Sequence, residues 1–170
     1  MKKLIVWTLM LLLLTGCAGN VKSGVALLEE KKYEEAVTAF QKDIEKGRNL
    51  GEAYRGLGIA HFELQEYEAA TEAFEAALEN ETKETAVIFG FLGACYLELE
   101  EYNRALDVYE KALDQDDLTA ELEQEIQYNL IALYEKKGDW KAAKKQMEKY
   151  IKNYPDDARV EKEAEFLETR

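Results

Sequence analysis

The chain has 170 residues, the length of a single domain, and only one proline, Pro155, as expected of an almost wholly helical protein. Its formal net charge is -13, and an acidic chain without a basic stripe repels phosphate, which argues against nucleic acid as a partner. Charged residues make up 34% of the chain, but the apolar residues recur periodically, so the composition does not indicate disorder.

The first seventeen residues combine a basic start, a short apolar run and a cysteine. Lys2 and Lys3 precede eleven largely apolar residues, 4–14. A membrane-spanning helix needs about 17–25 such residues, so this run has instead the proportions of a signal-peptide core. The run ends in Leu14, Thr15, Gly16 and Cys17, which resembles the lipobox of a bacterial lipoprotein.

That resemblance implies cleavage before Cys17, diacylglycerol attachment to its thiol, and often acylation of the new amino terminus. Two or three acyl chains give stable anchoring. We therefore expect residues 1–16 to be a cleaved signal peptide. The mature chain would then be lipid-anchored to the cell membrane or the outer membrane, on the extracytoplasmic side. A plain secretory signal or an uncleaved anchor is the alternative.

One amphipathic helix is repeated four times along the rest of the chain. In residues 67–78, Ala70, Phe74, Ala77 and Leu78 recur at three- and four-residue spacing and share one face. The four copies start with an aromatic residue, at spacings of 34, 35 and 38 residues, and a fixed period of this size indicates a repeat array. Their marker residues are Tyr33, Ala36 and Phe40; Tyr67, Ala70 and Phe74; Tyr102, Ala105 and Tyr109; and Trp140, Ala143 and Met147.

A second helix precedes each copy. Its markers are Gly24, Leu27 and Leu28; Leu57, Gly58 and Phe62; Leu92, Gly93 and Tyr96; and Leu130 and Tyr134. In this order the marks resemble the tetratricopeptide repeat (TPR), a pair of helices joined by a turn. The resemblance implies an all-α fold, an α-solenoid (right-handed superhelix) of about four helical hairpins in residues 17–157. We expect repeats at 17–50, 51–84, 86–119 and 124–157, and a capping helix at 158–170.

The fourth repeat departs most from the pattern. Ile131 stands where the other repeats have glycine, and Tyr150 stands where two of them have alanine. We expect Tyr150 to pack under the final segment. Four extra residues, 120–123, are expected to lengthen the helix that follows them.

The sequence contains no recognisable active site. Cys95 is expected to be an inert core thiol, and His61, the only histidine, a core or edge residue. No His, Cys, Asp or Glu residues occur at the spacing of zinc ligands. A glycine-rich phosphate loop is also absent, because the glycines at 56, 58, 90 and 93 lie inside predicted helices, where a small residue permits close packing. We therefore predict no catalytic residues, no metal site, no cofactor and no enzymatic activity.

TPR proteins bind partners mainly in a concave groove lined by the first helix of each repeat. Matching positions in this chain predict a partner-binding groove containing Lys22, Arg55, Ile59, Phe91, Ala94, Tyr128 and Asn129. Phe91 and Tyr128 would stand over glycine and alanine, leaving room for a partner side chain. The alternative is that Phe91 and Ile59 merely pack on neighbouring repeats. The Lys, Asn and Arg clamp with which some family members bind a C-terminal carboxylate is absent.

These features predict a membrane-anchored scaffold or adaptor of the bacterial cell envelope. Its partner would be a segment of another envelope protein, bound in the groove mostly by apolar contact. The alternative is a structural lipoprotein that self-associates into a homo-oligomer.

Overall fold

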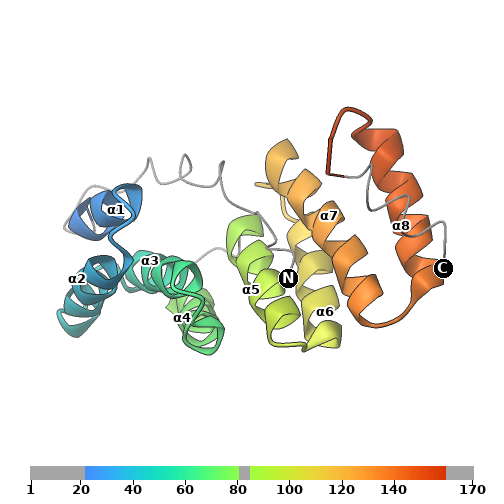
Figure 1. The fold of residues 1–170 in the computed structure, drawn as a ribbon. Coiled ribbons are helices and arrows are strands. Elements are labelled where there is room, and N and C mark those ends of the chain that lie inside the picture. Colours follow the sequence, from blue (N-terminus) through green and yellow to red (C-terminus); the bar gives the residue numbers. More distant parts are fainter. Residues whose placement is uncertain (1–21, 81–84, 160–170) are drawn as a thin grey trace. The chain divides into compact units, whose positions relative to one another are not determined.

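The computed structural model describes residues 22–80 and 85–159, and within these ranges it contains eight α-helices and no strand (Figure 1). The expected all-α fold class is confirmed. The helices belong to two compact units, divided between Glu84 and Thr85. The expected signal peptide, Cys17 and residues 160–170 of the expected capping helix lie outside the described residues.

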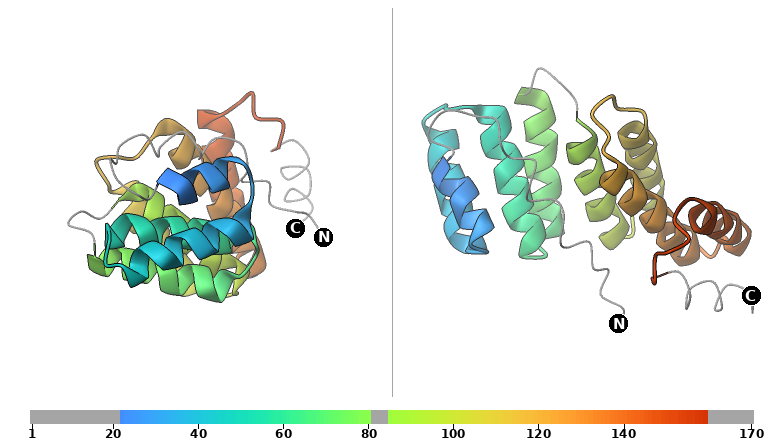
Figure 2. Two further views of the ribbon diagram at one scale, coloured as in Figure 1. Left: turned by 90° about the vertical axis from the view of Figure 1, so that its left-hand side faces the viewer. Right: turned by 90° about the horizontal axis from the view of Figure 1, so that it is seen from above.

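The first unit consists of two helical hairpins. Its helices are α1 (Lys22–Glu29), α2 (Tyr33–Glu45), α3 (Leu50–Glu63) and α4 (Tyr67–Asn80). Each helix packs on the next in the chain, and α1 also contacts α3 (Figure 2).

The second unit repeats this arrangement with α5 (Ala86–Glu98), α6 (Tyr102–Leu113), α7 (Ala120–Lys136) and α8 (Trp140–Asn153). Here α5 packs on α6 and α7, and α7 packs on α6 and α8. Helix α7 has 17 residues and begins at Ala120, so the expected lengthening by residues 120–123 is confirmed. The Thr119 hydroxyl accepts a hydrogen bond from the backbone N–H of Leu122 and caps this helix.

Each second helix begins at the aromatic residue that marks its repeat and buries the next two markers. The four marker alanines of α2, α4, α6 and α8 are fully buried, and so are Phe40, Phe74 and Tyr109. Met147 takes the ring position in α8 and is 3% exposed. The periodic pattern therefore marks the buried stripe of every second helix.

Glycines of the first helices accept these rings. A Cβ atom added to Gly24 would lie 2.6 Å from the Phe40 ring, and one added to Gly58 would lie 2.7 Å from the Phe74 ring. Gly56 also faces the Phe40 ring, at its Cζ and Cε1 atoms, and Gly93 faces the Tyr109 ring in the same way. Paired helices can approach closely because the ring lies where a side chain would otherwise be.

The fourth repeat fills the same contact with different residues. Ile131 replaces the glycine, Met147 replaces the ring, and both are buried in one cluster with Ala143 and Tyr150. Methionine is unbranched and flexible, so it fits beside a β-branched side chain where a ring would collide. The flexible Met147 therefore makes room for Ile131 by its shape, although the pair is bulkier than a ring on glycine.

Every hairpin turns through one residue with a left-handed backbone. These residues are Lys31, Gln65, Glu100 and Gly138, with φ of 58°, 62°, 62° and 73°. The next backbone N–H donates to a carbonyl five residues earlier, as in Glu66 to His61 at 2.9 Å and Asp139 to Tyr134 at 2.9 Å. The turns therefore close each first helix in the same way, although only the fourth uses the glycine that this conformation favours.

The contact between Gly58 and Phe74 predicts a specific coupling. We expect Gly58→Ala to lower the free energy of unfolding by about 1–3 kcal/mol, because the new Cβ collides with the ring. Alanine is intrinsically better than glycine in a helix by about 1 kcal/mol, which offsets only part of the loss. The same substitution in a Phe74→Met background, which imitates the fourth repeat, should cost clearly less. Equilibrium urea denaturation measures all four proteins, and an equal loss in both backgrounds would contradict the packing account.

Candidate partner-binding surface

In the first unit, the predicted groove residues lie on α1 and α3. Lys22 opens α1, and Arg55 and Ile59 stand four residues apart on one face of α3. Nη2 of Arg55 donates to the Glu52 carboxylate one turn earlier, whereas its Nε is buried and has no hydrogen-bond partner among the described residues. The Arg55 side chain is 16% exposed, so a partner can contact the guanidinium, but it reaches the unpaired Nε only if the covering side chains move.

Ile59, one turn after Arg55 on α3, and Val25 on α1 add apolar surface to this unit. Both are half-buried and pack against the core cluster that contains Leu28, Phe40 and Leu57. Packing on the core holds them in place, while their outer surface stays available. The first unit thus presents half-buried aliphatic side chains beside an arginine donor.

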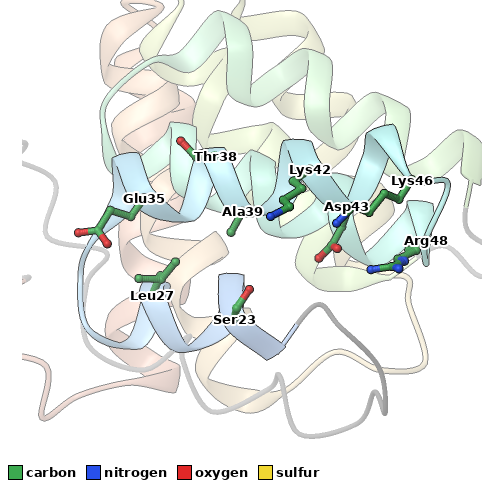
Figure 3. Close-up of a pocket in the computed structure, with 9 residues that line it drawn as sticks. All are labelled: Ser23, Leu27, Glu35, Thr38, Ala39, Lys42, Asp43, Lys46 and Arg48. Carbon is green, nitrogen blue, oxygen red and sulfur yellow. The ribbon is translucent and has the colours of Figure 1, made fainter.

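A hollow of about 520 Å³ lies between α1 and α2 of the same unit (Figure 3). Lys42, Lys46 and Arg48 lie near or just after the end of α2 beside Asp43, which is only 5% exposed, and Glu35 lies at the other end of the hollow. The hollow therefore favours ligands of neither sign strongly. Its lining residues are Ser23, Leu27, Glu35, Thr38, Ala39, Lys42, Asp43, Lys46 and Arg48.

The predicted groove residues on α5 are covered. Phe91 is 6% exposed and Ala94 is 8% exposed. The expectation that glycines leave room for a partner is wrong at both glycines of the predicted floor. The Phe40 ring occupies the space at Gly56, and a Cβ at Gly90 would lie 3.1 Å from Leu122 Cδ1. These glycines serve the packing of helices against each other.

On α7, the two neighbouring residues Tyr128 and Asn129 point differently. Asn129 is 4% exposed and lies against the hydroxyl of Tyr109 from α6. Burial raises the pKa of Tyr109, and the interaction with Asn129 opposes this shift. Asn129 therefore joins α6 to α7, whereas the Tyr128 ring carries the guanidinium of Arg159, 4.4 Å from its centroid.

The segment after α8 covers Tyr128 and Tyr150. Tyr150 is fully buried, and its hydroxyl donates to Oδ2 of Asp157 at 2.5 Å. Tyr150 thus packs under residues 154–159, and the rest of the expected final segment lies outside the described residues. Burial raises the pKa of Tyr150, and the hydrogen bond to Asp157 adds to the rise.

Arg159 holds this segment on α7. Its Nη1 donates to both carboxylate oxygens of Glu125, at 3.0 and 2.9 Å, and its Nη2 donates to Asp157 at 2.7 Å. The Arg159 guanidinium keeps the pKa of Asp157 well below its usual range, while burial raises the pKa of Glu125. Sequence reasoning missed this cluster, because Arg159 lies beyond the last full repeat and has no counterpart in the other three.

The residues considered for chemistry take structural places. Cys95 is fully buried in α5, as expected of a core thiol. His61 is half-buried, and its Nδ1 lies 2.6 Å from a carboxylate oxygen of Glu66 across the α3–α4 turn. Among the described residues, no group of three or more His, Cys, Asp or Glu side chains could hold a metal ion.

Serial helical hairpins with rings packed on glycine define a helical-repeat protein, the class that includes α-solenoid interaction scaffolds. Sequence models of the tetratricopeptide repeat match residues 21–86, 55–121 and 96–162. The chain therefore belongs to the tetratricopeptide repeat family.

Several solved structures share this fold. YrrB, described as a TPR protein with an unusual peptide-binding site, is 22% identical, and the match covers 87% of this chain and 74% of YrrB with a TM-score of 0.72. MamA from Desulfovibrio magneticus RS-1 is 20% identical over 91% of this chain and 87% of that protein, with a TM-score of 0.74. No curated protein is significantly similar in sequence. Within the described part of the chain, no helix combines the length and apolar character needed to cross a membrane.

The depressed pKa of Asp157 predicts how the C-terminal segment responds to acid. A carboxylate with a lowered folded-state pKa stabilises the fold above its unfolded-state value of about 4 and loses that contribution as the pH falls further. Wild type should therefore exceed Asp157→Asn in stability at pH 7, on the order of 1 kcal/mol, and the difference should shrink below about pH 4.

Urea denaturation across this pH range measures the difference. Asp156→Asn is the matched control, because Asp156 is the exposed neighbour of Asp157. It should show no comparable pH-dependent difference. A constant gap between wild type and Asp157→Asn down to pH 2 would contradict the charge-based account.

Proposed function

We propose that this protein is a lipid-anchored TPR scaffold of the bacterial cell envelope. A lipid on Cys17 would hold it at the extracytoplasmic face of the cell membrane or outer membrane. Its hairpins would bind a segment of another envelope protein along the first helices of the repeats. The TPR array supplies the binding fold, and the lipobox-like signal supplies the anchor.

The observation that carries the binding proposal is the state of Arg55. A buried Nε without an acceptor is unfavourable by about 1–3 kcal/mol, and a ligand acceptor that reached it after the covering side chains moved would gain this energy. A backbone carbonyl of an extended segment would do so, while Ile59 and Val25 contact its apolar side chains. YrrB, which shares the fold, is described as having a peptide-binding site, and a comparable use of the fold here is consistent with it.

The anchoring proposal rests on residues 1–17. Only Ala18–Asn20 separate Cys17 from the first predicted helical residue, so the array would lie close to the lipid surface. Loss of Lys2 and Lys3 with the signal would leave an even more acidic body, which an anionic leaflet repels. Partners would therefore meet the array near the membrane but on its water-facing surfaces.

The two cysteines give a matched test of the anchor. Cys17→Ser should move the protein from the membrane fraction to the soluble fraction and remove the acyl mass from its amino-terminal peptide. Cys95→Ala removes the buried thiol and should leave both unchanged. Fractionation and mass spectrometry of the native protein measure these outcomes, and membrane retention of unacylated Cys17→Ser would overturn lipid anchoring.

A photocrosslinking experiment tests partner binding. A photoreactive residue at position 59, on the half-buried face of α3, should crosslink to one other envelope protein in native membranes. Arg55→Ala should reduce this crosslink at least tenfold, whereas Arg48→Ala, which removes an exposed arginine outside α3, should not. A crosslink that is insensitive to Arg55→Ala would place the partner elsewhere.

The second candidate is self-association, with the array serving as a structural envelope protein. Ile151 on α8 is 37% exposed and is the one large apolar side chain that is exposed among the described residues. Crosslinks from position 59 only to other copies of this chain, together with an oligomeric mass by light scattering, would favour this candidate over the scaffold.

A further inference from the structure

The guanidinium of Arg159 is bound on every side. Nε donates to Asp157 at 3.1 and 3.0 Å, Nη1 donates to Glu125 at 3.0 and 2.9 Å, and Nη2 donates to the Tyr150 hydroxyl at 2.9 Å and to Asp157 at 2.7 Å. The Tyr128 ring covers its face at 4.4 Å. A planar cation with carboxylates at its edges and a ring on its face is the arrangement that a guanidinium fits best.

Most of this site belongs to the folded helices. Glu125 and Tyr128 lie on α7 and Tyr150 lies on α8, whereas Asp157 comes from the same short segment as Arg159. Tyr128 and Tyr150 pack edge to face with centroids 5.7 Å apart. The Gln124 amide donates to the Tyr150 hydroxyl at 3.2 Å. These contacts fix the helical part of the site independently of Arg159.

The segment that fills the site is short and irregular. Residues 154–159 follow the end of α8, and within them Pro155, Asp156 and Ala158 are exposed. Besides the contacts of Asp157 and Arg159, the Tyr154 ring packs against Tyr150 with centroids 4.8 Å apart. Asp157, Arg159 and Tyr154 make these contacts, so the segment could leave α7 and α8 as one local unit without unfolding either helix.

The position of the site connects it to partner binding. Glu125 and Tyr128 occupy positions of the fourth first helix that TPR proteins use for their groove. We propose that this face of α7 is an arginine-binding site, filled here by the chain's own Arg159, and that a partner segment bearing an arginine binds by displacing residues 154–159. The inference rests on the proposed scaffold function and names the chemistry of its ligand.

The seated segment defines what the partner should look like. It would carry an arginine with a carboxylate about two residues before it, as Asp157 precedes Arg159. Lysine would be a poor substitute, because a single ammonium nitrogen cannot serve Glu125 on one side and the Tyr150 hydroxyl on the other while lying flat on a ring. The net charge of -13 also attracts basic segments towards the protein.

The experiment uses the full chain and a peptide of its own sequence. A fluorescein-labelled, amidated peptide of residues 154–159 is titrated with wild type and with Arg159→Ala, and anisotropy reports binding. The tethered segment competes at an effective concentration of about millimolar, so the peptide should bind Arg159→Ala at least tenfold more tightly than wild type. The same peptide with lysine in place of arginine should bind at least tenfold more weakly.

Two control variants locate the binding. Tyr128→Ala combined with Arg159→Ala should abolish peptide binding. Arg104→Ala should bind the peptide as weakly as wild type, because Arg104 is an equivalent arginine stacked 4.1 Å from the ring of Tyr96 and paired with Glu101, outside the proposed site. If Arg159→Ala does not fold, as judged by circular dichroism, Arg159→Lys replaces it, and the same order of affinities is expected.

Three outcomes would overturn the proposal. Folded Arg159→Ala that takes up no peptide would show that Arg159 only fastens the end of the array. Equal binding by wild type and Arg159→Ala would place the peptide elsewhere. A dimer of wild type that is lost in Arg159→Ala would assign the site to a second copy of this chain. None of these results affects the crosslink from position 59. The crosslinking experiment therefore tests the scaffold proposal independently of the arginine-binding proposal.

Discussion

The packing of one ring against one glycine is the contact on which the other features of each hairpin depend. Phe40 fills the missing side chains of Gly24 and Gly56, and Phe74 fills that of Gly58. Because the ring takes the place of a side chain, the two backbones approach closely, and the marker alanines of the second helices are buried completely. The period of the sequence repeat therefore reflects the recurrence of this ring–glycine contact from one hairpin to the next.

The hairpins could be predicted from the sequence because the ring–glycine contact recurs in register. The direction in which individual side chains point could not be predicted from the sequence. Successive helix residues differ by about 100° in direction, so Tyr128 and Asn129 cannot both face outward, and the repeat pattern alone did not decide between them. In the structure Asn129 is buried beside Tyr109 of α6, whereas Tyr128 is half-buried. From the sequence alone, Gly56 could equally line the floor of a groove or pack against a neighbouring helix. The position of the Phe40 ring decides between these two roles.

The Arg159 cluster could not be predicted for a different reason. Repeat patterns describe contacts that recur, and this cluster occurs where the repetition ends. Tyr150 stands in a small-residue position and needs a cover, and the sequence indicated this much. Which residues supply the cover depends on how residues 154–159 return to α7 after Pro155. The pairing of Asp157 and Arg159 with Glu125 and Tyr150 is therefore a product of the tertiary fold.

The departures in the fourth repeat have a common physical origin. Ile131 with Met147 replaces a rigid ring on glycine by one β-branched and one flexible side chain, both buried. The ring that this exchange removes from the second position is replaced by Tyr150, three residues later on α8. There it meets Tyr128 and Tyr154, and its hydroxyl forms hydrogen bonds with Asp157 and Arg159.

The second unit thus has an aromatic and acidic surface on α7, whereas α3 of the first unit presents an arginine and aliphatic side chains. The two surfaces differ in the chemistry that they require, because Arg55 needs a carbonyl or carboxylate acceptor and Glu125 needs a guanidinium. Each requirement is stricter than apolar contact alone and would therefore exclude more of the wrong partners.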